Sequence, residues 1–124
     1  MPRVVHFEIP SGQPERAARF YSDVFGWQAN KWDGPQDYWL LRTGKQGEPG
    51  IDGGLLRKKA PDQPVVNTVD VPNVDDYAAR VTRAGGTIVV PKMPIPGVGW
   101  LVYFKDLDGN IVGMMQTDEK AGVE

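Results

Sequence analysis

Apolar and polar residues alternate in the stretch VVHFEIP at residues 4–10. A period of two predicts a strand whose two faces differ in character. Phe7 and Ile9 share one face of this strand, and His6 and Glu8 share the other. We therefore expect the apolar face to meet the core and the polar face to point away from it.

The spacing becomes helical in the next segment, PERAARFYSDVFGW at residues 14–27. Pro14 suits a first helical turn, and Gly26 ends the helix. The apolar positions that recur at helical spacing predict a buried stripe of Ala17, Phe20, Tyr21 and Val24. Phe20 and Tyr21 are expected to pack on Phe7 and Ile9. Strands follow at about residues 27–32, 38–43 and 51–58, separated by the turn sequences DGPQD and GKQGEPG.

The second half of the chain repeats this order. VVNTVDV at residues 65–71 predicts a strand, and Asn73 is expected to cap a helix with Asp76 as its partner. AGG at 84–86 ends that helix. Three strands follow, TIVV, WLVYF and IVGMMQ, with DLDGN as the turn before the last. The Pro-rich stretch at 91–100 is read as a loop, with three open roles: a lid, a dimer contact or a stiff connector.

The two halves align with a shift of about 60 residues, which places Gly26 on Gly86 and IDGGLL at 51 on IVGMMQ at 111. A repeated strand-helix-three-strand unit predicts an α+β fold built from two βαβββ modules. We expect one domain over residues 1–124, with the first module at about 1–60 and the second at about 61–124. The two modules should form a curled mixed sheet, a half-barrel, around a cavity.

Composition narrows the partners of this chain. It has 124 residues, no cysteine, one histidine and a net charge of −2 without a block of like charges. Cysteine chemistry is therefore excluded, and nucleic acid is not an expected partner. No apolar run approaches the roughly 20 residues of a membrane span. We expect a cytoplasmic protein without a membrane association.

The arrangement resembles the vicinal-oxygen-chelate superfamily, which includes glyoxalases, bleomycin-resistance proteins and extradiol dioxygenases, and in particular its glyoxalase-like members. The residues that carry the resemblance are HFEIP followed by ERAARFYSDVFGW, then VDVPNVDDYAARVTRAGG, and finally KDLDGNIVG. The resemblance implies isomerase, lyase, dioxygenase or epimerase activity, or the binding of a drug-like molecule. Fold alone does not choose among these functions.

In metal-dependent members of that superfamily, four strand positions that point into the cavity hold one divalent cation. The resemblance places the first of them at His6. The shift of 60 residues places the second at Val66, or at Asn67 if the strand slips by one. The last-strand positions are Gly53 and Gly113.

The end of the chain departs from the pattern of the metal-binding members. These often read Asp-Gly-Asn-x-x-Glu, whereas DGNIVG at 108–113 ends in glycine. A stable site for a transition metal needs about three protein ligands. With only His6 able to coordinate among the inherited positions, we expect no metal and no cofactor.

Several residues remain candidates for a small-molecule site. His6 either binds a ligand oxygen or transfers a proton, or it is a relic position satisfied by water or Glu8. Glu8 either orients His6 or acts as a base, or it is a solvated strand carboxylate. Thr68 shares the predicted face of Val66 and is expected to line the cavity.

The remaining candidates are two glycines and two tryptophans. Gly53 and Gly113 either leave room for a ligand or allow close backbone approach. Trp39 and Trp100 lie on matching strands and are either cavity walls or core residues.

We therefore expect a protein that binds a small, partly apolar or aromatic molecule without the superfamily metal site. The alternative is an enzyme, either a metal-dependent lyase, isomerase or dioxygenase, or a metal-free acid–base catalyst that uses His6 and Glu8. Open sheet edges, together with the resemblance, favour a homodimer.

Overall fold

The computed structural model describes residues 2–123 and shows two successive blocks of one strand, one helix and three strands. The first block consists of β1 (Arg3–Ser11), α1 (Pro14–Phe25), β2 (Gln28–Lys31), β3 (Tyr38–Arg42) and β4 (Gly53–Arg57). The second consists of β5 (Val66–Asp70), α2 (Val74–Arg83), β6 (Thr87–Ile95), β7 (Gly99–Lys105) and β8 (Ile111–Thr117). The chain divides into two compact units, one of residues 5–65 and one of residues 66–123 with the stretch before residue 5.

Each module contains a mixed sheet of the same topology. The strand order is β2-β3-β4-β1 in the first module and β5-β8-β7-β6 in the second. β1 is parallel to β4 and β5 is parallel to β8, whereas the other neighbours are antiparallel. The predicted α+β fold with two βαβββ modules is therefore confirmed. That residues 1–124 act as a single domain stays a prediction.

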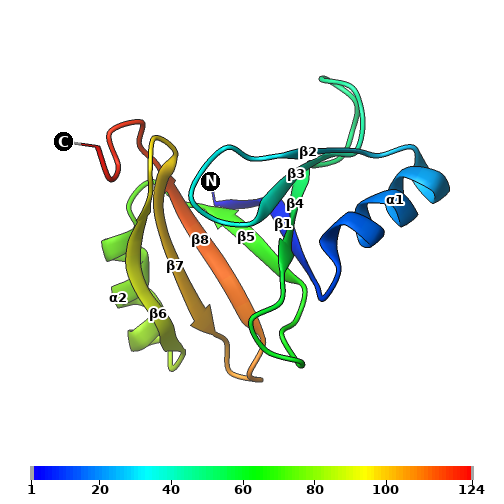
Figure 1. The fold of residues 1–124 in the computed structure, drawn as a ribbon. Helices are drawn as coiled ribbons and strands as arrows, with labels where there is room; N and C mark the ends of the chain where they lie inside the picture. The colour runs from blue at the N-terminus through cyan, green and yellow to red at the C-terminus, as the bar shows by residue number, and fades with distance from the viewer. Residues whose placement is uncertain (1, 124) are drawn as a thin grey trace. The chain divides into compact units, whose positions relative to one another are not determined.

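The core of the first module lies between its sheet and α1, which packs against β2 and β4 (Figure 1). Leu41 and Leu55 are almost completely buried there. Burying a side chain of this size stabilises the fold by roughly 1.5–3 kcal/mol. Partly buried residues that surround these two and Trp39 are Phe7, Ile9, Ala17, Ala18, Trp27 and Ala29.

The predicted buried stripe of α1 was wrong at two positions. Phe20 is 59% exposed and Val24 is 53% exposed. The face turned toward the sheet is centred instead on Ala17 and Ala18, whose small side chains let the helix approach closely. Phe20 lies outside that face and packs edge-on against the ring of Tyr21, 5.4 Å between centroids.

The core of the second module lies on the face of its sheet that α2 covers (Figure 1). Its fully buried members are Val71, Val74, Val102 and Met114. As predicted, Asn73 caps α2, because its side chain accepts a hydrogen bond of 3.0 Å from the backbone N–H of Asp76. The helix ends before Gly85, which has a φ of 99°.

The sequence predicted a loop over the Pro-rich stretch 91–100, but residues 91–95 form the second half of β6, and only residues 96–98 are a turn before β7 begins. The β6–β7 ladder shifts register between Ile88 and Val90 and again between Val90 and Met93. Pro91 lies in this irregular part of the ladder. Proline has no backbone N–H to donate, and the regular hydrogen-bonding pattern is already interrupted there. No helix within residues 2–123 is long and apolar enough to cross a membrane.

Candidate functional site

Strand alternation in β1 places the only histidine on the sheet face opposite the helix. Phe7 and Ile9 pack into the cluster that contains Ala17 and Ala18 of α1. His6 therefore points to the other face, as the sequence predicted. Glu8 shares that face.

His6 is hydrogen-bonded to a tyrosine of the same module. Its Nε2 atom lies 2.6 Å from the phenol oxygen of Tyr38, which begins β3. The two rings are nearly parallel, with 6.4 Å between centroids and 13° between planes. Trp32 packs edge-on against Tyr38 at 6.3 Å. Tyr38 therefore lies beside the imidazole, and Trp32 lies beside Tyr38.

Burial and the nearby carboxylates together set the electrostatics of this group. Burial raises the pKa of Tyr38 well above its ordinary value, and the charge of Glu8 and a hydrogen bond to that carboxylate act in the same direction. Burial lowers the pKa of His6, although the charges of Glu8 and Asp52 act to raise it. At neutral pH, His6 and Tyr38 are therefore both uncharged, next to carboxylates. We refer to His6, Glu8 and Tyr38 as the polar triad.

A glycine makes room for the triad, but it is Gly54 rather than the predicted Gly53. Gly54 is the register partner of Glu8, and a Cβ atom on it would overlap the phenol of Tyr38. Gly53 pairs with Phe7 instead, and a Cβ atom there would come within 2.5 Å of the Phe7 ring. Gly53 thus lies on the helix face, where it allows close packing of that ring.

The two predicted cavity tryptophans lie on the helix faces of their modules. Trp39 is 8% exposed and belongs to the core of the first module. Trp100 packs against the core of the second module, and its Nε1 donates a hydrogen bond of 3.0 Å to Asp118. Of the two roles considered from the sequence, cavity wall or core residue, both tryptophans have the second.

Val66 and Thr68 lie on the predicted face of β5, and that they line a cavity stays a prediction. Val66 and Thr68 are buried on the face of β5 opposite α2, since the next residue, Val69, packs into the helix-side core. Thr68 pairs with Gly113, which also pairs with Tyr103. A Cβ atom on Gly113 would lie 3.2 Å from both Thr68 and Tyr103. These residues form a small group without the charge that Glu8 brings to the first module.

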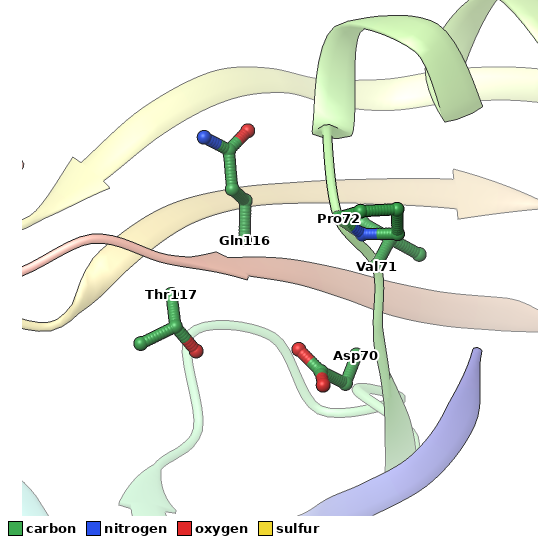
Figure 2. Close-up of a pocket in the computed structure, with 5 residues that line it drawn as sticks. All are labelled: Asp70, Val71, Pro72, Gln116 and Thr117. Carbon is green, nitrogen blue, oxygen red and sulfur yellow. The ribbon is translucent and has the colours of Figure 1, made fainter. Parts of the chain in front are cut away.

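A cavity of about 340 Å³ opens in the second module where β5 and β8 end (Figure 2). Asp70 and Thr117 lie on one side of β8, and Gln116 lies on the other. The Gln116 oxygen already accepts a hydrogen bond from the backbone N–H of Val74 at the start of α2. A second cavity, of about 350 Å³, lies in the hairpin loop of residues 42–52. Neither cavity includes His6 or any other residue that the sequence singled out.

The family model for the Glyoxalase/Bleomycin resistance protein/Dioxygenase superfamily matches residues 3–114. The chain belongs to this superfamily. It is 34% identical over 116 residues to a glyoxylase-like domain-containing protein of Didymella fabae, covering 83% of this chain and 84% of the relative.

Two solved structures share the fold of this chain. A hypothetical protein from Bacillus halodurans C-125 has a TM-score of 0.70 at 14% identity, over 95% of this chain and 96% of that one. A variant of Streptomyces coelicolor methylmalonyl-CoA epimerase, in complex with 2-nitronate-propionyl-CoA, has a TM-score of 0.69 at 15% identity, over 93% and 94% of the two chains. At these identities the likeness shows the fold alone.

This superfamily member has few side chains that fit the metal centre implied by the resemblance. Of the four inherited positions, only His6 carries a donor, and its Nε2 is already bonded to Tyr38. Across residues 2–123, no three His, Cys, Asp or Glu side chains are grouped so that they could hold a metal ion. The residues present therefore do not fit a three-ligand centre.

Sequence reasoning missed two members of the candidate site, Tyr38 and Trp32. The signal for Tyr38 was present, because it precedes Trp39 on a strand and must face the opposite side. The sequence predicted a strand that includes Trp32. What brings Trp32 opposite Tyr38 is a backbone hydrogen bond across the hairpin, from the N–H of Trp32 to the carbonyl of Tyr38. No pattern in the sequence specifies that bond.

Proposed function

We propose that this superfamily member binds a small, partly apolar or aromatic molecule at the polar triad, without a metal ion. The observation that carries the proposal is the 2.6 Å contact of His6 with Tyr38, beside Glu8. Small-molecule sites combine apolar and aromatic walls with a few polar groups that fix orientation. Trp32 and Tyr38 supply the wall, and His6 and Glu8 supply the polar groups.

An apolar side chain next to the triad supports the same proposal. Leu40 pairs with Gly54 across the β3–β4 ladder and is 48% exposed, on the face that carries Tyr38. An exposed leucine beside partly buried polar groups gives a ligand both apolar area and hydrogen bonds. Covering it with a ligand contributes roughly 25 cal/mol per Å² of apolar surface removed from water.

Acid–base catalysis is the second candidate function, and the 2.6 Å hydrogen bond between His6 and Tyr38, beside the charge of Glu8, favours it. A neutral imidazole with a lowered pKa accepts a proton without first losing one. The metal-dependent lyase, isomerase and dioxygenase activities of the superfamily lack such support here, because the donor set does not fit the ion.

The test begins with elemental analysis of protein purified without a metal-affinity tag. Thermal unfolding is then followed with small neutral aromatic compounds and with divalent metals. A ligand at a hundredfold excess over its dissociation constant stabilises the native state by about 2.7 kcal/mol. We expect stabilisation by aromatic compounds that is lost in His6→Ala and kept in Arg83→Ala, an exposed control on α2. Stoichiometric metal that disappears in His6→Ala would replace this proposal with the metalloenzyme alternative.

We also propose a homodimer. Phe20, Val24 and Phe25 of α1 are each more than half exposed, which is unusual for three large apolar side chains on one short helix. The strand β2 also forms an edge of the first-module sheet. Light scattering at micromolar concentration is expected to give twice the chain mass, and Phe20→Ser is expected to lower it. A monomer mass for the unmodified chain would refute the dimer.

A further inference from the structure

We propose that Asp33 and Gly34 form a site of spontaneous backbone modification, at which the aspartate converts to isoaspartate. The two residues lie in the hairpin loop that joins β2 to β3, between Trp32 and Tyr38. The structure restrains this pair less than the two other pairs in the chain in which glycine follows aspartate. The modification does not depend on the proposed function, but it alters the surroundings of the site at which that function is proposed.

The reaction needs only these two residues and water. The backbone nitrogen of Gly34 attacks Cγ of Asp33, the N–Cγ bond forms, and the amide proton leaves with the carboxyl hydroxyl as water. Water then opens the succinimide ring that results. Opening at the main-chain carbonyl of Asp33 leaves the nitrogen of Gly34 bonded to Cγ, so the main chain gains a methylene group. Glycine favours the attack because it has no side chain to hinder the approach.

The chain contains three aspartate–glycine pairs, Asp33–Gly34, Asp52–Gly53 and Asp108–Gly109. The second of them is held in the sheet. The Asp52 side chain accepts a hydrogen bond of 2.9 Å from the backbone N–H of Thr43. Gly53 is buried in β4 and has register partners on both neighbouring strands. Its nitrogen can reach Cγ of Asp52 only when the sheet opens locally.

The third pair lies in a turn with several internal hydrogen bonds. The N–H of Gly109 donates to the carbonyl of Asp106 at 3.2 Å. The side chain of Asp106 also accepts hydrogen bonds from the backbone N–H groups of Asp108 and Asn110, each of 2.9 Å. Attack by the nitrogen of Gly109 therefore requires the turn to open. The loss of one neutral hydrogen bond predicts conversion about two- to tenfold slower than in the unfolded chain.

The loop of residues 33–36 is closed at its base but unbonded at the reacting atoms. At the base, the N–H of Trp32 donates to the carbonyl of Tyr38 at 2.8 Å. Among residues 2–123, the structure shows no hydrogen-bond partner for the Asp33 side chain or for the N–H of Gly34. Asp33 is also exposed. Its carboxyl group can therefore turn toward the nitrogen of Gly34 without breaking a hydrogen bond.

The added methylene group lies next to the aromatic wall of the proposed site. The Trp32 ring packs directly over Gly34, where an added Cβ atom would overlap it. The same ring stands edge-on to Tyr38, with 6.3 Å between centroids. A longer main chain between Trp32 and Tyr38 displaces one ring relative to the other. Isoaspartate at position 33 is therefore expected to disturb the hydrogen bond between Tyr38 and His6.

The modification is tested by peptide mapping, because trypsin places the three pairs on separate peptides, 32–42, 46–57 and 106–120. Protein is incubated at physiological temperature and neutral pH, and isoaspartate is located by electron-transfer fragmentation and by enzymatic methylation of isoaspartyl carboxyl groups. A parallel sample unfolded in guanidinium chloride gives each pair its own reference rate. We expect folding to slow conversion least at Asp33, about two- to tenfold at Asp108, and most at Asp52.

Asp33→Glu is the matched variant, because glutamate keeps the charge but closes the corresponding larger ring much more slowly. It should remove isoaspartate from peptide 32–42 and leave the other two peptides unchanged, whereas Asp108→Glu should leave peptide 32–42 unchanged. The unmodified chain decides the question even if a variant does not fold. Folding that protects Asp33 as strongly as Asp52, or more strongly than Asp108, would overturn the proposal.

The effect on the site is read by NMR from His6, whose ring resonances are unambiguous because it is the only histidine in the chain. Protein with isoaspartate at position 33 is separated by ion-exchange chromatography. Its His6 resonances should differ from those of fresh protein, while Asp33→Glu incubated for the same time should keep them. Unchanged resonances in the converted fraction would refute the effect on the site. Neither measurement uses a ligand, so a failure to bind aromatic compounds would refute the proposed function alone.

Discussion

The two modules share one topology but differ in what their sheets carry on the face opposite the helix. In the first, Glu8 and Leu40 flank Gly54. In the second, Thr68 and Tyr103 occupy the same positions around Gly113. The carboxylate of one module is thus a hydroxyl in the other.

Tyr38 marks a second difference. It lies two residues before the partner of Gly54, and the residue at the same place before the partner of Gly113 is Leu101. The first strands differ too, since His6 on β1 is equivalent to the apolar Val66 on β5. A repeated fold therefore preserves helix-side packing, while the opposite face is free to become charged in one copy and neutral in the other. The site that we propose therefore lies in the first module.

The largest expected effects come from the cores, where the modules are alike. Leu55→Ala in the first module and Met114→Ala in the second should each lower the free energy of unfolding by about 2–5 kcal/mol, because each opens a cavity in a packed cluster. Phe20→Ala, at an exposed position, should cost less than about 1 kcal/mol. Urea unfolding measures all three. A Phe20→Ala loss as large as that of Leu55→Ala would place the aromatic ring inside the core.

Substitution by alanine should destabilise the protein more at Gly54 than at Gly113. A Cβ atom at Gly54 overlaps Tyr38, so Gly54→Ala should displace the phenol from His6 and cost about 1–3 kcal/mol. At Gly113 the nearest atoms are 3.2 Å away, and a shift of a few tenths of an ångström suffices. Gly113→Ala should therefore cost less than about 1 kcal/mol. Denaturant unfolding gives the energies, and the His6 resonances show whether the triad has been disrupted. Equal costs would mean that Tyr38 moves aside freely.

Sequence reasoning identified the repeat, the helix ends and the face of β1, because each depends on local periodicity or on a residue with a special backbone preference. Gly26 has a φ of 73°, and Asn73 accepts the expected capping bond. The superfamily was also recognisable, since its motifs extend over most of the chain.

Register was harder to predict than topology. The equivalent residues of the first strands, Glu8 and Thr68, are 60 positions apart, whereas Gly54 and Gly113 are 59 apart. A constant shift therefore selected Gly53, on the wrong face of β4. A slip of one residue reverses every side chain of a strand. The sequence left Trp39 open between a cavity wall and a core residue, and its register on β3 places it in the core, with Tyr38 on the other face.

The helix starts give the next comparison. The side chain of Asn73 caps α2, whereas Gln13 precedes α1 without a side-chain cap. Asn73→Ala should lower the free energy of unfolding by about 0.5–2 kcal/mol, and Gln13→Ala should leave it nearly unchanged. Both are measured by thermal and urea unfolding. A comparable loss in the two variants would show that the side-chain cap of Asn73 is not what distinguishes the two helix starts.

The smallest effect is the pH dependence that His6 gives to the first module alone. Burial lowers its pKa in the folded state, while the unfolded state keeps an ordinary value near 6.5. As the pH falls below about 6.5, the unfolded chain binds a proton that the folded chain resists, so stability decreases. This contribution is complete above the unfolded pKa and is lost as the pH falls toward the folded pKa.

The control must separate His6 from the other titratable groups near its imidazole ring. Glu8 and Asp52 oppose the shift, and Tyr38 stays protonated because its pKa is raised. The depressed carboxyl pKa values, at Asp37, Asp106 and Asp118, affect stability only at lower pH. Urea midpoints at pH 7.5, 6.5 and 5.5 should therefore fall for the unmodified protein and stay flatter for His6→Gln. A His6→Gln midpoint that falls as steeply would assign the pH dependence to groups other than His6.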